Sequence, residues 1–145
     1  MVSDDVAMVA APCVVTGPQI PPPPTTMTTQ EIAERLVALC RQGNFEAAQK
    51  ELFADDAVSL EPYATEGFQK ETKGLPAIIE KGRRFTAMIE ELHASAVSDP
   101  LVARNSFACT MRMDVTMKGQ GRMDMSDLCV YEVKDGKILS EQFHV

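Results

Sequence analysis

Three side chains capable of acid–base chemistry stand where a fold could direct them into its interior. Glu61 ends a short alternating stretch that begins at Ala57, and Pro62 follows it directly. Asp127 interrupts an otherwise apolar strand face, and His93 stands where a helical period gives way to an alternating one. Carboxyl and imidazole groups are the usual general acids and bases of enzymes. Glu61, Asp127 and His93 are therefore the candidate catalytic residues.

The surroundings of Asp127 indicate which form of its carboxyl group the protein would favour. It lies between Met125 and Cys129 on the same alternating face. An ionised carboxylate there would lose its hydration, so we expect its pKa to rise unless a partner compensates. A neutral Asp127 could donate a hydrogen bond or act as a general acid. The alternative is a local bulge that turns Asp127 to solvent.

Glu61 and His93 each allow a functional and a structural interpretation. A carboxylate at a rigid strand end can reach into a cavity and remove a proton next to a carbonyl, although solvated Glu is also common before proline. His93 could assist as a second acid–base group, or could be structural at an element boundary. The only other histidine, His144, is next to the C-terminus, so a multi-histidine metal site is excluded. This chemistry needs neither a metal nor an organic cofactor.

Further polar and apolar side chains share the predicted strand faces and could line a ligand pocket. Methionines suit a deformable apolar cavity, although they are also routine core residues. Glu141 is a lower-ranked pocket residue, and Tyr131 could equally belong to the core. The candidate ligand-binding residues are Tyr63, Tyr131, Glu141, Phe143 and Met111.

The first half of the chain predicts three helices. Thr28 and Glu31 form a capping-box pattern at the start of the first, and Gly43 can end it in the left-handed conformation. Asn44 can cap a second, shorter helix. Gly74 precedes a third, whose apolar stripe contains Leu75, Ile78, Ile79, Phe85, Ile89 and Leu92.

The second half predicts long strands. Short strands are expected at 57–61 and near 69–72, and longer ones at 93–97, 107–117, 123–133 and 138–145. Asp135-Gly136 between two apolar runs is a strong hairpin signal. Arg112, Asp114 and Arg122 alternate away from the apolar face, which favours cross-strand ion pairs or a dimer surface. Helices followed by antiparallel strands are typical of an α+β domain.

Composition limits the partners and the organisation of the chain. One domain fits 145 residues, no apolar run is long enough to cross a bilayer, and the net charge of −7 disfavours nucleic acid. The four cysteines show no CxxC spacing, so we interpret them as buried thiols of a reducing cytoplasm. Residues 1–27 contain Pro21-Pro22-Pro23-Pro24 and predict a flexible leader, with Met27 as an alternative start. The folded domain is then 28–145.

Two stretches resemble known proteins. The stretch LFADDAVSLEP, at 52–62, is similar to a segment of ketosteroid isomerases and SnoaL-like proteins, and YEVKDGKILSEQF, at 131–143, resembles the closing hairpin of SnoaL-like domains. With the element order, they indicate a SnoaL-like domain of the nuclear transport factor 2-like superfamily. The resemblance covers about 28–145. It implies an α+β fold in which a cone-shaped, curved antiparallel sheet packs on the three helices.

The resemblance also implies roles for two residues. In ketosteroid isomerase the acid before the first strand's proline is the general base, which corresponds to Glu61. That enzyme keeps a second acid protonated as a hydrogen-bond donor, and Asp127 is the nearest match here. Leu36 stands near the position of that enzyme's first-helix tyrosine.

These features leave two functional hypotheses open. The first is isomerase- or cyclase-type proton transfer on a small apolar, carbonyl-bearing ligand, without nucleic-acid or membrane partners. The second is a non-catalytic ligand-binding or dimerisation module of the same fold. In either case we expect a homodimer that associates through the sheet.

Overall fold

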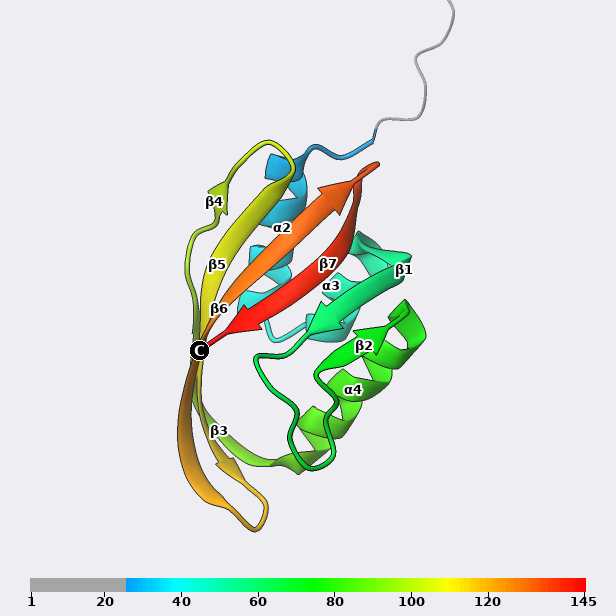
Figure 1. The fold of residues 1–145 in the computed structure, drawn as a ribbon. Helices are drawn as coiled ribbons and strands as arrows, with labels where there is room; N and C mark the ends of the chain where they lie inside the picture. The colour runs from blue at the N-terminus through cyan, green and yellow to red at the C-terminus, as the bar shows by residue number, and fades with distance from the viewer. Residues whose placement is uncertain (1–25) are drawn as a thin grey trace, which may run out of the picture.

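The computed structural model describes residues 26–145. Most of the predicted leader, including Cys13 and the proline run, lies outside these residues. Two helices open the domain, α2 (Thr29–Arg41) and α3 (Phe45–Leu52), and α4 (Leu75–Met88) is inserted between the second and third strands. Figure 1 shows the three helices on one side of a curled sheet. Among the described residues, no helix has both the length and the apolar character that a membrane crossing needs.

The first helix begins and ends where its capping signals predict, and α3 begins after Asn44, although the Asn44 side chain makes no capping hydrogen bond. The Thr28 side chain accepts a hydrogen bond from the Glu31 backbone, and the Glu31 carboxylate accepts one from the Thr28 backbone. Gly43 follows the first helix with φ of 78°. Pro76 lies in the first turn of α4, where its missing N–H removes no helical hydrogen bond. These local signals are sufficient to set the helix starts.

Seven strands form one curled, unclosed sheet. In chain order they are β1 (Phe53–Leu60), β2 (Glu71–Lys73), β3 (Ile89–Val97), β4 (Leu101–Val102), β5 (Ser106–Met117), β6 (Gly121–Lys134) and β7 (Lys137–His144). Their spatial order is β2-β1-β7-β6-β5-β3, and β4 also pairs with β5. Asp135 and Gly136 both have positive φ, 53° and 75°, as a tight β6–β7 hairpin turn requires. The long β5–β6 hairpin extends below the helices in Figure 1.

The expected α+β cone architecture is confirmed, but the sheet is mixed rather than antiparallel throughout. The last strand returns to the first, and β1 pairs with β7 in parallel, so that Ser59 is directly opposite Glu141. Alternation along a strand determines which residues share a face, but it carries no information about which distant strand lies alongside. This pairing therefore had to come from the tertiary structure.

The boundary between α4 and β3 also differs from the prediction. Ile89 and Leu92 were expected on the helical stripe, but α4 ends at Met88 and the chain continues as a strand. Ile89 pairs with Met117 of β5, and Leu92 pairs with Val115 and is 52% exposed. A β-branched Ile suits an extended strand, and pairing with β5 outweighs the helical spacing.

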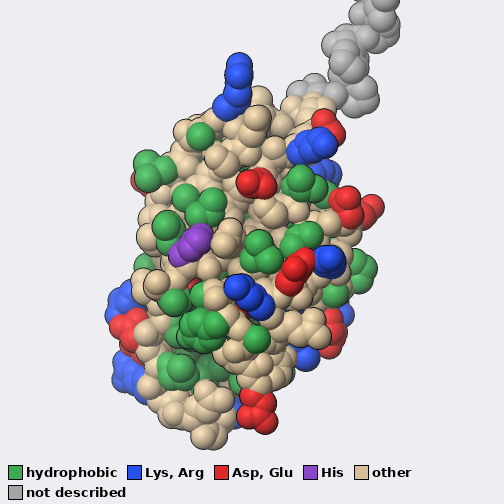
Figure 2. Space-filling model, in the orientation of Figure 1, with side chains coloured by type: hydrophobic (Ala, Val, Ile, Leu, Met, Phe, Trp, Pro, Cys, Tyr) green, Lys and Arg blue, Asp and Glu red, His purple; other side chains and the backbone are tan. Residues whose placement is uncertain are grey.

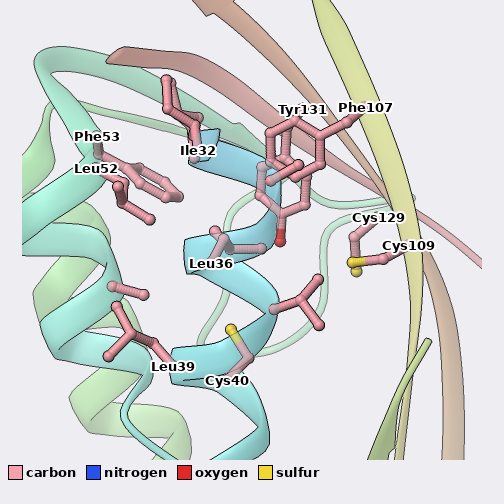
Figure 3. Packing of buried hydrophobic residues seen from close by; sticks show 14 of the residues in the cluster. Ile32, Leu36, Leu39, Cys40, Leu52, Phe53, Phe107, Cys109, Cys129 and Tyr131 are labelled. Atoms are coloured by element: carbon pink, nitrogen blue, oxygen red, sulfur yellow. The ribbon is translucent and has the colours of Figure 1, made fainter. Parts of the chain in front are cut away.

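The core fills the space between the helices and the inner face of the sheet, defined as the face toward the helices. Figure 3 shows its centre, where the Tyr131 and Phe107 rings stack with centroids 4.7 Å apart. Phe53 meets Tyr131 edge-on. Cys40, Cys109 and Cys129 are buried free thiols, as expected from their apolar faces.

Candidate functional site

A group of polar side chains continues the inner face where the apolar core ends. Glu61 follows the last residue of β1, and its backbone N–H donates to the carbonyl of Lys70 across the β1–β2 connection at 2.7 Å. Its side chain is about one quarter exposed, at 27%. Glu61 therefore stands at the mouth of the curled sheet on a fixed backbone, as a strand-end carboxylate should.

Lys81 is the cation of this group, and the sequence analysis did not identify it. It lies one helical turn after Ile78 on the buried face of α4, and only 8% of the residue is exposed. Its ammonium group donates to Glu61 Oε1 at 3.1 Å and to Ser59 Oγ at 2.7 Å. The ammonium also lies 5.5 Å from the centre of the Phe143 ring, a distance suited to a cation–π contact.

Ser59 connects this lysine to a second, deeper carboxylate. The Ser59 hydroxyl is fully buried and donates to Glu141 Oε1 at 2.8 Å. Glu141 is 4% exposed, and burial raises its pKa to about 6, although the Ser59 hydrogen bond and the Lys81 charge both act in the opposite direction. The hydrogen bonds form one chain, from Glu61 through Lys81 and Ser59 to Glu141. We call these four residues the Lys81 network.

Asp127 points inward, as its strand face predicts. On β6 it alternates with exposed neighbours and shares its face with the buried Cys129 and Tyr131. Desolvation raises the pKa of Asp127, and the nearby negative charge of Glu61 raises it further. The charge of Glu61, which follows β1, therefore acts on the carboxyl group of Asp127 on β6. The environment of Asp127 favours its neutral form, and this form can donate a hydrogen bond.

Two candidate ligand-binding residues lie beside these carboxyl groups. Met111 is half-buried and directly opposite Asp127 on β5. Phe143 is half-buried on β7, next to Cys129 of β6 and below the Lys81 ammonium. Together they give the carboxyl groups an apolar wall on one side.

The other candidates are placed elsewhere. Tyr131 is 2% exposed and belongs to the core, because its ring is held between Phe107 and Phe53. Tyr63 is on the β1–β2 loop and is 60% exposed. Glu141 does lie near the site, but it is buried and hydrogen-bonded to Ser59. Tyr131 is directly opposite Glu141 on the neighbouring strand, but neither tyrosine is part of the hydrogen-bond chain of the Lys81 network.

His93 lies on the other side of the sheet, which corrects the expectation that it assists Glu61 and Asp127. The register of β3 against β5 shifts between Leu92 and Ala94. Leu92 faces inward opposite Val115, so the following imidazole is on the outer side, where its Nε2 is 2.6 Å from Thr116 Oγ1. Thr116 alternates with the inward-facing Val115 and Met117 of β5. The sheet therefore separates His93 from the two carboxyl groups.

The outer face of the sheet carries a different kind of charge cluster. Arg112 forms two hydrogen bonds with the Asp124 carboxylate, and Arg122 forms two with the Asp114 carboxylate. These are the cross-strand ion pairs that the alternation predicts. In Figure 2, which views the sheet from the side opposite the helices, hydrophobic side chains gather over the strands and many charged ones lie toward the edges.

No metal site is evident among residues 26–145, because no three His, Cys, Asp or Glu side chains there converge as metal ligands. A surface hollow lies at the opposite end of the domain, between the start of α2 and the β6–β7 hairpin. None of the candidate catalytic residues lines it. The chemistry that the fold brings together is therefore that of the Lys81 network and Asp127.

Comparison with known proteins agrees with this architecture. A crystal structure of a proposed SnoaL-like polyketide cyclase from Mesorhizobium loti, also designated a carbohydrate phosphatase, is 35% identical; the match covers 82% of this chain and 100% of that one, with a TM-score of 0.75. A proposed isomerase from Bacillus subtilis is 23% identical, with coverages of 79% and 84% and a TM-score of 0.60.

A third similar structure contains a steroid ligand. It is a Mycobacterium tuberculosis protein in complex with estradiol-17beta-hemisuccinate, 16% identical, with coverages of 82% and 95% and a TM-score of 0.63. At this identity the likeness shows a common fold. Among curated proteins, none matches this chain. The SnoaL-like domain model matches residues 27–145, nearly the whole described part, and the chain therefore belongs to the SnoaL-like family.

Proposed function

We propose that this protein binds a small apolar, carbonyl-bearing molecule at the mouth of the cone and moves a proton on it. The observation that carries the proposal is that Glu61 and Asp127 share one inner face but have different surroundings: Glu61 is paired with Lys81, whereas Asp127 is partly buried and near the charge of Glu61. The Lys81 ammonium 3.1 Å from Glu61 stabilises a carboxylate there. Desolvation and the Glu61 charge both raise the pKa of Asp127. Such a pair assigns a base and a neutral donor.

The roles follow from that difference. Glu61 removes a proton from the carbon next to the ligand carbonyl, and Asp127 donates a hydrogen bond to the carbonyl oxygen as negative charge develops on it. Met111 and Phe143 contact the apolar body of the ligand. The product after the proton returns is an isomerised or cyclised ketone, the reaction types attributed to the relatives from Bacillus subtilis and Mesorhizobium loti.

The test combines binding with hydrogen exchange. The protein is mixed in D2O with a β,γ-unsaturated steroid ketone and, separately, with a flat aromatic polyketide ketone, and NMR follows exchange of the hydrogens next to the carbonyl. Thermal denaturation measures binding in parallel. We expect stabilisation by at least one ligand and exchange that Glu61→Gln slows by about 10²- to 10⁴-fold. Absence of both signals with every ligand would contradict the proposal.

A matched pair of variants tests the role of Asp127. Asp127→Asn retains an N–H donor at the same position, whereas Asp127→Leu retains only the shape. We expect the Leu variant to slow exchange by about 10²-fold or more and the Asn variant to retain most of the rate. Equal exchange rates in the two variants would show that Asp127 is not the hydrogen-bond donor.

The second candidate function is ligand binding without catalysis. The half-buried Met111 and Phe143 favour it as much as the first, because an apolar wall binds whether or not chemistry follows. In that case the ligand stabilises wild type and Glu61→Gln equally, and no exchange occurs. A homodimer through the outer face of the sheet is compatible with either function, and light scattering of the purified chain measures it.

A further inference from the structure

The Lys81 network holds more charge than a single base requires. One buried ammonium faces two carboxylates, one at the mouth of the cone and one sealed in the interior. A buried acid is costly in itself, and here the cost is visible as the raised pKa of Glu141. Replacing a Glu with a neutral residue at this position would avoid that cost. The retained acid therefore needs a physical reason.

The reason lies in what happens to Lys81 when Glu61 changes charge. When Glu61 accepts a proton, its carboxyl group becomes neutral and the Lys81 ammonium loses its directly bound counter-ion. A buried cation without a partner is strongly destabilising. Glu141 remains within reach through the Ser59 hydroxyl, which accepts from Lys81 and donates to Glu141. The second carboxylate thus keeps the ammonium compensated in both protonation states of Glu61.

We propose that Lys81 is the positioning residue of the Glu61 carboxylate, and that Glu141, through Ser59, provides its ammonium with a second counter-ion that does not depend on the charge of Glu61. Glu61 can then gain and lose a proton without leaving a buried cation uncompensated. That Glu61 changes charge during proton transfer on a ligand rests on the proposed function. The charge coupling among the four residues does not.

The charged and titratable groups around the Lys81 network are consistent with these roles of Lys81 and Glu141. Glu61 faces Lys81 from α4 and Asp127 from β6, and its own charge raises the pKa values of both Asp127 and Glu141. Glu141 is surrounded by weak acids that stay neutral near pH 7. Burial raises the pKa of Cys40 to about 12 and also raises the pKa of Tyr131, while the hydrogen bond with Cys109, together with burial, raises the pKa of Cys129. Among residues 26–145, Lys81 is the only cation that contributes to the pKa of Glu141.

A mutant cycle tests the coupling without any substrate. Glu61→Gln imitates a protonated Glu61, and Glu141→Gln removes the second counter-ion. At pH 7.5 we expect each single variant to retain a melting temperature close to wild type. The double variant leaves Lys81 uncompensated, so it should melt about 10 °C lower or more, well beyond the sum of the single effects.

Two further variants test whether the loss of stability comes from the uncompensated charge of Lys81. Adding Lys81→Met to the double variant removes the uncompensated ammonium. It should reverse at least half of the decrease in melting temperature. The double variant Glu46→Gln/Glu51→Gln removes the same charge from exposed acids on α3, and its effects should be additive. Additive effects in the Glu61/Glu141 cycle, or no recovery in the triple variant, would overturn the proposal.

A spectroscopic readout follows the same coupling. Carbon-13 NMR of labelled glutamate side chains reports the titration of Glu141 directly. We expect its pKa to fall below about 6 in Glu61→Gln, where a repelling charge is lost, and to rise in Lys81→Met and Ser59→Ala. Lys81→Arg, which keeps the charge, should stay closest to wild type. A Glu141 titration that is unchanged in all variants would contradict the counter-ion role.

Measuring ketone hydrogen exchange in Lys81 variants distinguishes a failure of this proposal from a failure of the proposed function. If ketone exchange is detected, Lys81→Met should slow it by about 10-fold or more at saturating ligand, with little change in ligand affinity, and Lys81→Arg should restore part of the rate. If no ketone exchanges, the proposed function fails while the thermodynamic cycle still decides the coupling among the four residues.

Discussion

Two clusters of charge on opposite faces of the same sheet differ in almost every physical respect. On the outer face, Arg112 and Arg122 hold Asp124 and Asp114 in exposed, bidentate pairs between adjacent strands. On the inner face, Lys81, whose side chain is 10% exposed, holds the fully buried Ser59 and the partly exposed Glu61. Exposed pairs contribute little to stability, whereas removal of one member of a buried set is costly. The comparison indicates that only the inner cluster can control the charge of a site.

The largest expected effect is on the inner cluster. Lys81→Met leaves Glu61 and Glu141 without their cation, and we expect a loss of about 3 kcal/mol in the free energy of unfolding at pH 8. At pH 5 the loss should be smaller, because Glu141, with a pKa of about 6, is then mostly neutral. Urea denaturation at the two pH values measures both.

A lysine in an exposed ion pair provides the control for this change. Lys50→Met removes one of the two cations that pair with Glu46 on α3, the other being Arg83, and it should cost less than about 0.5 kcal/mol at either pH. Equal losses for Lys81→Met and Lys50→Met would show that burial of the inner cluster does not matter.

The next effect is a pH dependence carried by Glu141. Its pKa in the folded protein, about 6, lies above the ordinary value of 4.5, so the folded state binds this proton more tightly than the unfolded state does. Its contribution to stability is therefore full below pH 4.5 and is lost as the pH rises through 6. The loss amounts to about 2 kcal/mol by pH 8. Glu141→Gln should lack this component of the pH profile.

The measurement is the difference between the unfolding free energies of wild type and Glu141→Gln from pH 4 to 8. The difference should change in favour of the variant as the pH rises. Glu132→Gln, on the outward side of β6, should follow the wild-type profile. A flat difference curve for Glu141→Gln would mean that this carboxyl group is not desolvated in solution.

The smallest effect belongs to the outer face. A double-mutant cycle with Arg112→Met and Asp124→Asn should give a coupling energy below about 1 kcal/mol that shrinks further in 1 M salt. Chemical denaturation at low and high salt measures it. A coupling as large as that of the inner cluster would remove the contrast between the two faces.

Much of the candidate site was visible in the sequence, but its connecting residues were not. Alternation along β6 placed Asp127 on the inner face, and the strand-ending proline marked Glu61. Lys81 does stand on the apolar stripe of its helix, three residues after Ile78, and this spacing was the available signal. His93 lies on the outer face beside Thr116, at a point where the register of β3 against β5 shifts, so it does not join Glu61 and Asp127. A single irregularity of that kind leaves no clear mark in the sequence.

The sequence by itself determined the elements, the helix caps, the closing hairpin and the face of each long strand. These features depend on local periodicity and on turn residues such as Asp135 and Gly136, and such interactions span only a few positions. Only the tertiary structure decided that β7 returns beside β1 in parallel and joins Ser59 to Glu141 across 82 positions. The physical reason is that strand partners are chosen by the packing of the whole sheet. The buried chain of hydrogen bonds around Lys81 exists only once that packing is complete.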